Sequence, residues 1–238
     1  MVAPAVSAPV VRDGVVLITQ AEVAAGNITP GDTAGFPITI SRSGTYRLAG
    51  NLQVAVGPNG FVVQAPHVTL DFAGFHLDGV GKAGSGVVGK QPGLTVRGGT
   101  ISGFKRAGIS SAGAMLMVEK MRIFNNQGDG VNDAGGDALI VGSLLVANAY
   151  GVQCAKVCHV QDNVVSGNRS GGIGIAVNLD PFERVGASIM GNTISANGGY
   201  GARGNGFSVG GNNFANNISG NFTGLYNAID SNGCSGPC

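Results

Sequence analysis

The segment "AGISSAGAMLMVEKMRIFNN", residues 107–126, is one copy of a repeat that decides the fold. A glycine and a short apolar run open the copy, an alternating run follows, and a third run precedes an asparagine. The opening glycine recurs every 21 or 22 residues, at Gly86, Gly108, Gly130, Gly151 and Gly172. A fixed period of this length is typical of solenoid proteins, in which each repeat packs on the next.

Each copy contains three short β-like runs, and no run is long enough for a crossover helix. In the second run apolar residues alternate with other residues, as Leu94 and Val96 or Leu116 and Val118 do. Alternation with a period of two indicates a strand with one buried face. The sequence therefore predicts an all-β, single-domain parallel β-helix with about 22 residues and three short strands per coil.

Alignment of the copies gives the residues that we expect to point inward. In the second run they are Val68/Leu70, Leu94/Val96, Leu116/Val118, Leu139/Val141, Cys158/Val160 and Phe207/Val209. In the third run they are Ile101, Ile123, Val146, Val165, Ile194 and Phe214.

An asparagine stands three residues after the third-run position in four copies, as Asn126, Asn168, Asn197 and Asn217. Asparagine tolerates the left-handed backbone conformation and hydrogen-bonds neighbouring backbone groups. We therefore expect a ladder of stacked asparagines in one turn, with amide hydrogen bonds from coil to coil.

The composition excludes several classes of protein. Hydrophobic residues make up 43% and charged residues 11% of the chain, which argues against intrinsic disorder. The net charge of +1, without a basic stripe, argues against a nucleic-acid partner. No apolar run is long enough to span a bilayer. Residues 1–14 lack a signal-peptide pattern, so we expect the signal of an exported protein to have been removed.

Four cysteines bear on the compartment. We expect Cys234 and Cys238, in "CSGPC", to form a disulfide that pins the C-terminus, with two free thiols as the alternative. Cys154 and Cys158 either pair or are buried thiols. Disulfides form in oxidising compartments, so the predicted location is extracellular or periplasmic.

The ends and one insertion interrupt the repeat. Residues 1–43 are predicted to form a lead-in and cap with a short helix in residues 19–27. The coils are predicted to fill residues 44–233, and residues 234–238 close the C-terminal end. Residues 178–186 lengthen one coil, and this insertion is either the wall of a groove or a tolerated surface loop.

The stretch "GDGVNDAGGD", residues 128–137, raises the question of a metal site. Its aspartates fit neither an EF-hand loop nor a calcium-binding nonapeptide repeat. The remaining hypothesis is that Asp129, Asp133 and Asp137 converge at one corner and bind Ca²⁺. The alternative is that all three are polar turn residues on a solvated edge.

Few residues are candidates for chemistry. His159 is expected to point outward from the second-strand sheet and is the acid–base candidate, with Asp133 and Arg184 as further catalytic candidates. The substrate-binding candidates are aromatic or basic residues near the coil starts, a turn and the insertion: Tyr150, Tyr200, Lys156 and Phe182.

The coil pattern, the lead-in at residues 18–52 and the "CSGPC" ending resemble a known group. This group is the bacterial exported right-handed parallel β-helix repeat proteins of the pectate-lyase-like superfamily. The resemblance implies a right-handed coil and an exported location, but no particular activity. The motifs NTD, DD, GHG and RIK of polygalacturonases and WxDH and RxPxxR of pectate lyases are absent, which disfavours those two activities.

Two classes of function follow. The first is an exported protein that binds or processes an extracellular polysaccharide or another cell-surface component; as an enzyme it would be lyase-like or glycoside hydrolase-like. The second is a non-catalytic structural or adhesive module that self-associates as a trimer or filament.

Overall fold

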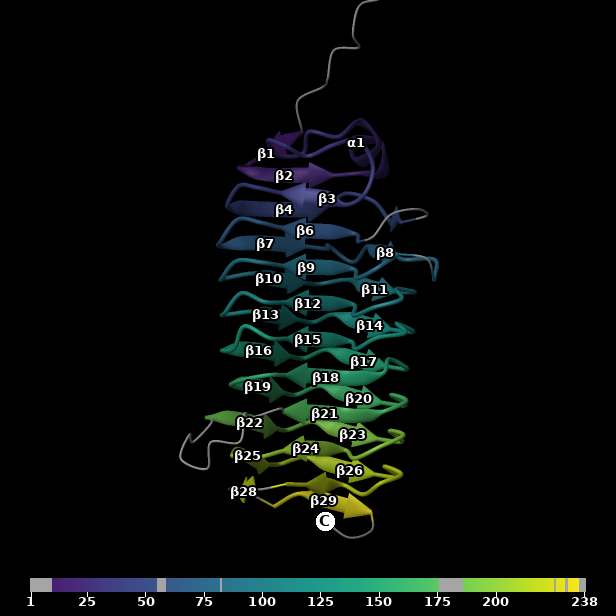
Figure 1. Ribbon diagram of the computed structural model, residues 1–238, viewed down its shortest axis with the longest axis vertical. Coiled ribbons are helices and arrows are strands. Elements are labelled where there is room, and N and C mark those ends of the chain that lie inside the picture. The colour runs from purple at the N-terminus through teal and green to yellow at the C-terminus, as the bar shows by residue number, and fades with distance from the viewer. Residues whose placement is uncertain are drawn as a thin grey trace, which may run out of the picture.

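The computed structural model describes residues 10–54, 59–81, 83–175, 186–224, 226–229 and 231–235. The chain winds as a right-handed parallel β-helix whose coils stack along one axis from the N-terminal to the C-terminal end (Figure 1). Coils of about 22 residues contribute three short strands each, which confirms the predicted fold class.

Three sheets run the length of the stack, and their strands are parallel except for β1. Sheet A contains β1 (Val11–Arg12), β2 (Val15–Ile18), β4 (Gly44–Leu48), β7 (Val68–Asp71), β10 (Thr95–Arg97), β13 (Met117–Glu119), β16 (Ala138–Val141), β19 (Cys158–Gln161), β22 (Ala187–Met190), β25 (Phe207–Gly210) and β28 (Tyr226–Ala228).

Sheet B follows a second side of the coil. It contains β3 (Ile38–Ile40), β6 (Phe61–Val63), β9 (Val87–Gly89), β12 (Ile109–Ser111), β15 (Val131–Asp133), β18 (Tyr150–Cys154), β21 (Gly171–Ile175), β24 (Ala202–Gly204) and β27 (Phe222–Thr223). Sheet C forms the third side. It contains β5 (Leu52–Gln53), β8 (His76–Asp78), β11 (Thr100–Ser102), β14 (Arg122–Phe124), β17 (Leu144–Val146), β20 (Val164–Ser166), β23 (Thr193–Ser195), β26 (Asn213–Ala215) and β29 (Gly233–Ser235).

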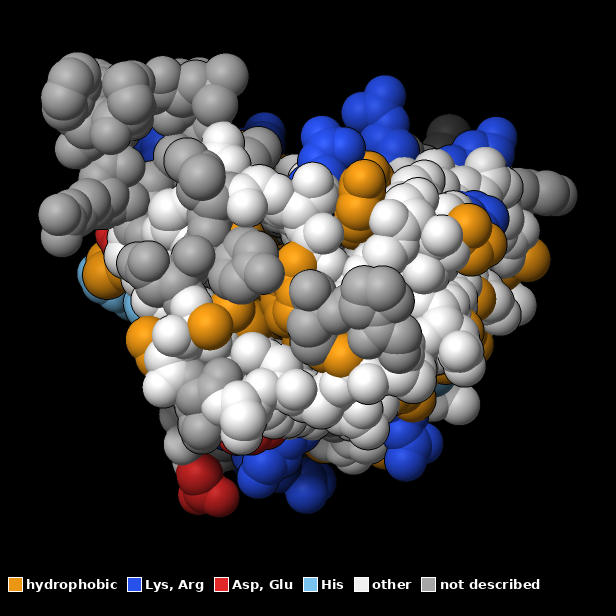
Figure 2. Space-filling model, turned by 90° about the horizontal axis from the view of Figure 1, so that it is seen from below, with side chains coloured by type: hydrophobic (Ala, Val, Ile, Leu, Met, Phe, Trp, Pro, Cys, Tyr) orange, Lys and Arg blue, Asp and Glu red, His pale blue; other side chains and the backbone are white. Residues whose placement is uncertain are grey.

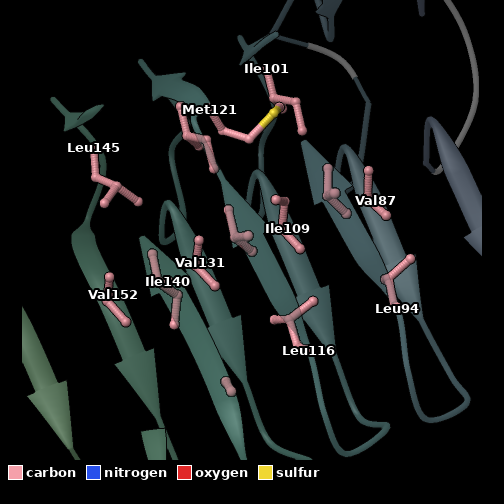
Figure 3. Packing of buried hydrophobic residues seen from close by; sticks show 14 of the residues in the cluster. Val87, Leu94, Ile101, Ile109, Leu116, Met121, Val131, Ile140, Leu145 and Val152 are labelled. Carbon is pink, nitrogen blue, oxygen red and sulfur yellow. The ribbon is translucent and has the colours of Figure 1, made fainter. Parts of the chain in front are cut away.

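Each coil passes from sheet B to sheet A and then to sheet C. Strands pair in parallel with the same strand of the next coil, so Ile109 is in register with Val131, and Val131 with Val152. The inward residues therefore form columns along the axis, as Figure 3 shows for this column of sheet B. These three side chains are fully buried, and the apolar area removed from water stabilises the stack.

The N-terminal end is capped as the sequence predicts. Helix α1 (Gln20–Ala25) begins after Thr19, which forms a capping box with Glu22. Val23 of this helix is buried against the core. The antiparallel pair of β1 and β2 covers the edge of sheet A, and β2 already pairs with β4.

The surface carries little charge. Seen from the C-terminal end, Lys and Arg side chains gather at two edges of the outline, and the side chains coloured by type between these edges are mostly uncharged (Figure 2). In the described residues, no helix is long and apolar enough to cross a membrane.

The structure corrects the predicted register in one coil. Ala138 and Ile140 point inward from β16, whereas Leu139 and Val141 point outward and are partly exposed. In β17 of the same coil Leu145 is the inward residue, and the prediction of Val146 was wrong. The segment "ALIVGSLLV" is apolar at almost every position, so its alternation has no unique phase. Pairing with the coil above decides the phase, because Val118 is in register with Ile140.

The predicted asparagine ladder is confirmed and contains one more member. It runs through Asn126, Asn148, Asn168, Asn197 and Asn217 between sheets C and B. Between successive members, the Oδ1 atom of one asparagine accepts the backbone N–H and the Nδ2–H of the asparagine one coil earlier, as Asn168 does from Asn148 at 3.0 and 3.3 Å. The sequence comparison missed Asn148 because it counted from Val146 and not from Leu145.

A second ladder, which was not predicted, lies in the two-residue turn between sheets A and C. It runs through Ser143, Asn163, Asn192, Asn212 and Asn232 with the same pattern of hydrogen bonds. In both turns the residue before the ladder position has the positive φ, such as Ala147 at 56° and Asp162 at 55°. The ladder asparagines themselves do not adopt the left-handed conformation.

The corrected register predicts opposite effects for two neighbouring substitutions. Ile140→Asp places an unpaired charge in the core and is expected to lower the unfolding free energy by more than about 4 kcal/mol. Leu139→Asp places the charge on the outer face and is expected to cost about 1 kcal/mol or less. Urea denaturation followed by circular dichroism measures both values, and equal losses would contradict this register.

The ladder predicts a large cost for removal of one buried amide. Asn168→Ala removes the acceptor of the Asn148 backbone N–H and of one Nδ2–H of Asn148, and it removes a donor to the Leu145 carbonyl, so we expect a loss of at least about 2 kcal/mol. The melting temperature should then fall by several degrees. Asn213→Ala, at an exposed position of β26, is the matched control and should change stability by less than about 0.5 kcal/mol. Similar losses in the two variants would argue against the ladder.

Candidate functional site

Between β15 and β24 the outer face of sheet B carries polar and aromatic side chains. Asp129, Tyr150, Gly171 and Tyr200 follow one another in one outward column, one residue from each of four successive coils. Asn132, Gln153, Gly174 and Arg203 form the neighbouring column, in register along the axis. We call this surface, defined by the six side chains Asp129, Asn132, Tyr150, Gln153, Tyr200 and Arg203, the tyrosine face.

Each of the two tyrosine rings lies close to a glycine of the next coil. A Cβ atom at Gly171 would lie 2.6 Å from Cε1 of Tyr150, so only a glycine leaves room for that ring. A Cβ atom at Gly220 would lie 3.6 Å from Cε1 of Tyr200. Both tyrosines are partly exposed. Each tyrosine directly precedes a coil-starting glycine in the sequence, and the register of the coils places both on one face.

Hydrogen bonds hold Asp129 and Asn132 of the tyrosine face in place. The Oδ2 atom of Asp129 accepts from Nδ2 of Asn132 at 2.7 Å, and its Oδ1 atom accepts from the backbone N–H of Tyr150 at 3.2 Å. The amide of Gln153 lies over Gly174, where a Cβ atom would be 2.7 Å from Nε2. A fixed carboxylate and two amides therefore lie beside the rings.

The corner between sheets B and A joins several predicted residues. A disulfide links Cys154 to Cys158, with their Cα atoms 6.3 Å apart. Of the two possibilities left open for this pair, the structure shows the bond. Lys156 lies in the same turn, and its side chain packs over Gly136. A Cβ atom added at Gly136 would lie 3.1 Å from Cβ and Cδ of Lys156. The predicted partner of Cys234, Cys238, lies outside the described residues.

Asp133 points inward at this corner and is almost fully buried. Its Oδ2 accepts the Gly136 N–H at 2.9 Å and its Oδ1 the Gly135 N–H at 3.3 Å. Burial raises the pKa of this carboxyl above its ordinary value, and the charge of Asp137 adds to the rise. The two glycine N–H groups and Lys156 lower the pKa by less.

His159 points outward from sheet A, on the other side of the solenoid wall from Asp133. Its Nδ1 lies 2.8 Å from Oγ of Ser188 in the next coil. The structure therefore does not bring His159 and Asp133 into contact. Arg184 and Phe182 lie outside the described residues, so a catalytic role for His159, Asp133 and Arg184 stays a prediction.

The three aspartates of residues 128–137 differ in their surroundings. Asp129 belongs to the tyrosine face, Asp133 is buried, and Asp137 is exposed with a φ of 57°. Among the described residues, no three His, Cys, Asp or Glu side chains gather in a group that could hold a metal ion. The Ca²⁺ site stays a hypothesis, and the described residues supply no group of carboxylates that would bind the ion.

A surface ion cluster lies on sheet A near the N-terminal end. Asp71 bridges Arg47 at 3.1 Å and Arg97 at 3.3 Å. Burial raises the pKa of Asp71, but the Ala73 N–H and the two arginines together outweigh it and hold the pKa below its ordinary value. Asp71 thus joins two arginines on the adjacent strands β4 and β10.

Asn132, Gln153 and Arg203 were not among the predicted site residues. Each stands one position after the inward residue of the first run, where Ser110 stands in an earlier copy. The repeat alignment therefore already placed these three residues at equivalent outward positions. It did not single them out, because polar side chains at outward positions are common. Only their position beside the tyrosine column distinguishes them.

By sequence, the chain matches no protein-family model and no curated protein. Among solved structures, it is similar to the A-module of the mannuronan C-5 epimerase AlgE6 of Azotobacter vinelandii. The identity is 13%, the likeness covers 94% of this chain and 90% of that one, and the TM-score is 0.41. It is also similar to the Dettilon tailspike protein at 13% identity, over 92% of this chain and 54% of that one, with a TM-score of 0.51. The likeness to the tailspike protein concerns the fold.

The raised pKa of Asp133 predicts a pH-dependent stability. Between the unfolded pKa, about 3.9, and the higher folded pKa, the folded state binds more protons than the unfolded state. The contribution of Asp133 is therefore fully present below the unfolded pKa and is lost as pH rises through the folded pKa.

We expect Asp133→Asn to remove this dependence, so the stability of the wild type relative to the variant should fall as pH rises through that window. Urea denaturation of both proteins across the acidic range measures the difference. Asp162→Asn is the control for loss of a negative charge elsewhere. A difference between wild type and Asp133→Asn that is constant with pH would contradict the assignment.

Proposed function

We propose that this protein is an exported β-helix protein that binds an extracellular polysaccharide along the tyrosine face. The observation that carries the proposal is the column of Tyr150 and Tyr200, whose rings lie over Gly171 and Gly220. Flat, partly exposed rings are surfaces on which the C–H faces of sugars stack. Such rings contribute apolar contact and lose little side-chain entropy on binding.

The polar neighbours of the rings suit sugar hydroxyl groups. The Asp129 carboxylate is an acceptor, and the amides of Asn132 and Gln153 are donors and acceptors. Hydrogen bonds to an ionised carboxylate are stronger than neutral ones, so Asp129 is suited to orient a saccharide. Because Asp129 is itself held by Asn132 and by the Tyr150 N–H, little ordering is needed on binding.

The spacing of the rings suits a chain and not a single sugar. Adjacent strands of a sheet lie about 4.8 Å apart, so two coils separate the rings by about 10 Å along the axis. An extended saccharide that lies parallel to the axis contacts both rings and passes the carboxylate. The substrate-binding role proposed for Lys156 would belong to the edge of this surface, beside β18, and the role proposed for Phe182 stays a prediction.

The disulfide between Cys154 and Cys158 supports an oxidising compartment, in keeping with an extracellular ligand. The alternative function, lateral self-association, is favoured by a different observation. Leu144 and Val164 are adjacent on the outer face of sheet C and are 36% and 42% exposed. Exposed apolar patches mark interaction surfaces, so a second copy of the chain is the competing occupant of that face.

A glycan-binding screen followed by titration tests the proposal. The wild type is expected to bind at least one acidic or neutral polysaccharide, and Tyr150→Ala and Tyr200→Ala are each expected to weaken that binding by about tenfold, or ~1.4 kcal/mol. Phe124→Ala is the matched control, because it removes a partly exposed ring from the outer face of sheet C. It should leave the affinity unchanged.

Incubation of each bound glycan with the protein then separates binding from catalysis. Ultraviolet absorbance detects unsaturated uronates and an assay of reducing ends detects hydrolysis. Failure to bind any glycan, together with a concentration-dependent oligomer that Val164→Thr weakens, would refute the proposal in favour of self-association.

A further inference from the structure

A hollow of about 400 Å³ lies at the corner where sheet A turns into sheet C, away from the tyrosine face. It extends across three successive coils and is open to solvent. Its lining is Gly74, Gly98, Gly99, Thr100, Lys120 and Arg122.

The floor of the hollow is bare backbone for steric reasons. A Cβ atom at Gly99 would clash with Phe72 and lie 2.6 Å from the carbonyl oxygen of Phe75, so only glycine is allowed there. Gly98 and Gly74 have φ angles of 70° and 88°, in the left-handed region that favours glycine. Without side chains at these three positions, the turn leaves a depression between neighbouring coils.

Two cations form the wall of the hollow. Lys120 and Arg122 are on either side of Met121 in one turn, and within the described residues neither side chain has an ion-pair partner. The carboxylate closest to the floor, Asp71, is already bound by Arg47 and Arg97. The positive charge of the hollow is therefore not neutralised from within this part of the chain.

This arrangement occurs in one coil of the described stack. The positions of Lys120 and Arg122 are taken by Gly142 and Leu144 in the next coil. In the coil after that they are taken by Asp162 and Val164. A basic pair beside a glycine floor is therefore a local feature and not a consequence of the repeat.

We propose that this hollow is a binding site for a compact oxyanion group, namely a carboxylate, sulfate or phosphate. The planar guanidinium of Arg122 binds two oxygens of such a group, and the Lys120 ammonium adds a point charge. The Thr100 hydroxyl at the base is a further donor. An opening to solvent allows the anionic group to be part of a larger molecule, such as an acidic saccharide.

The site is independent of the tyrosine face, because different sheets and turns build the two. The experiments can therefore refute the oxyanion site and still support polysaccharide binding on the tyrosine face. They can equally support the oxyanion site and refute polysaccharide binding. Since the two cations are exposed, binding should weaken as the concentration of an indifferent salt rises.

Titration of the full chain with sodium sulfate, inorganic phosphate and D-glucuronate, each monitored by amide chemical shifts, tests the proposal. We expect saturable shifts of Gly98, Gly99 and Thr100 with at least one of the three anions, and none with glucose. The anion with the highest affinity indicates whether the natural ligand carries a sulfate, a phosphate or a carboxylate group. Absence of saturable shifts with all three would overturn the proposal.

Two variants test the residues. Lys120→Gln combined with Arg122→Gln should lower the affinity by at least about tenfold. Lys105→Gln combined with Arg106→Gln removes an exposed basic pair from the turn between sheets C and B and should change it less than twofold. Gly98→Asn fills the hollow without a change of charge at a position that tolerates asparagine, and should also weaken binding. Equal losses in the two double variants would show general electrostatic attraction and refute a site.

Discussion

The hydrogen bond from a backbone N–H to the side-chain oxygen of an asparagine one coil further on is the constraint on which this structure depends. Sharp turns point backbone groups into the core, where water cannot reach them, and an unsatisfied group there costs about 1–3 kcal/mol. The two ladders satisfy these groups in the turns between sheets A and C and between sheets C and B. No buried side-chain polar atom in the described residues lacks a partner.

Because the ladders fix the turns, successive coils superimpose and the outward residues fall into columns. A column brings together residues about 21 or 22 positions apart, as it does for Asp129 and Tyr150. The surface chemistry of the protein is therefore set by single positions in the repeat. Glycine is as important in these columns as the larger side chains. Gly171 leaves room for the ring of Tyr150, and Gly99 has no side chain to fill the hollow between sheets A and C.

The two candidate sites differ in the kind of evidence that supports them. On the tyrosine face, hydrogen bonds already hold Asp129 in the same column as two aromatic rings, which favours recognition of an extended neutral or acidic sugar chain. At the corner between sheets A and C, two exposed cations stand beside bare backbone, which favours a small anionic group. The apolar residues of β17 and β20 leave sheet C as the face best suited to contact with another protein surface.

The sequence by itself determined the architecture, since the spacing of glycines, the alternation around Val96 and Val118, and the asparagine after the third run of four copies are local patterns. Tyr150 and Tyr200 each precede a coil-starting glycine in the sequence, and the stacking of the coils places both on one face. Tertiary structure decided the phase of residues 138–146, where a nearly unbroken apolar run fits two registers and a one-residue slip exchanges the two faces. It likewise decided that Asp133 and His159 lie on opposite sides of the wall. Contacts between coils depend on exact register, and periodicity alone does not supply it.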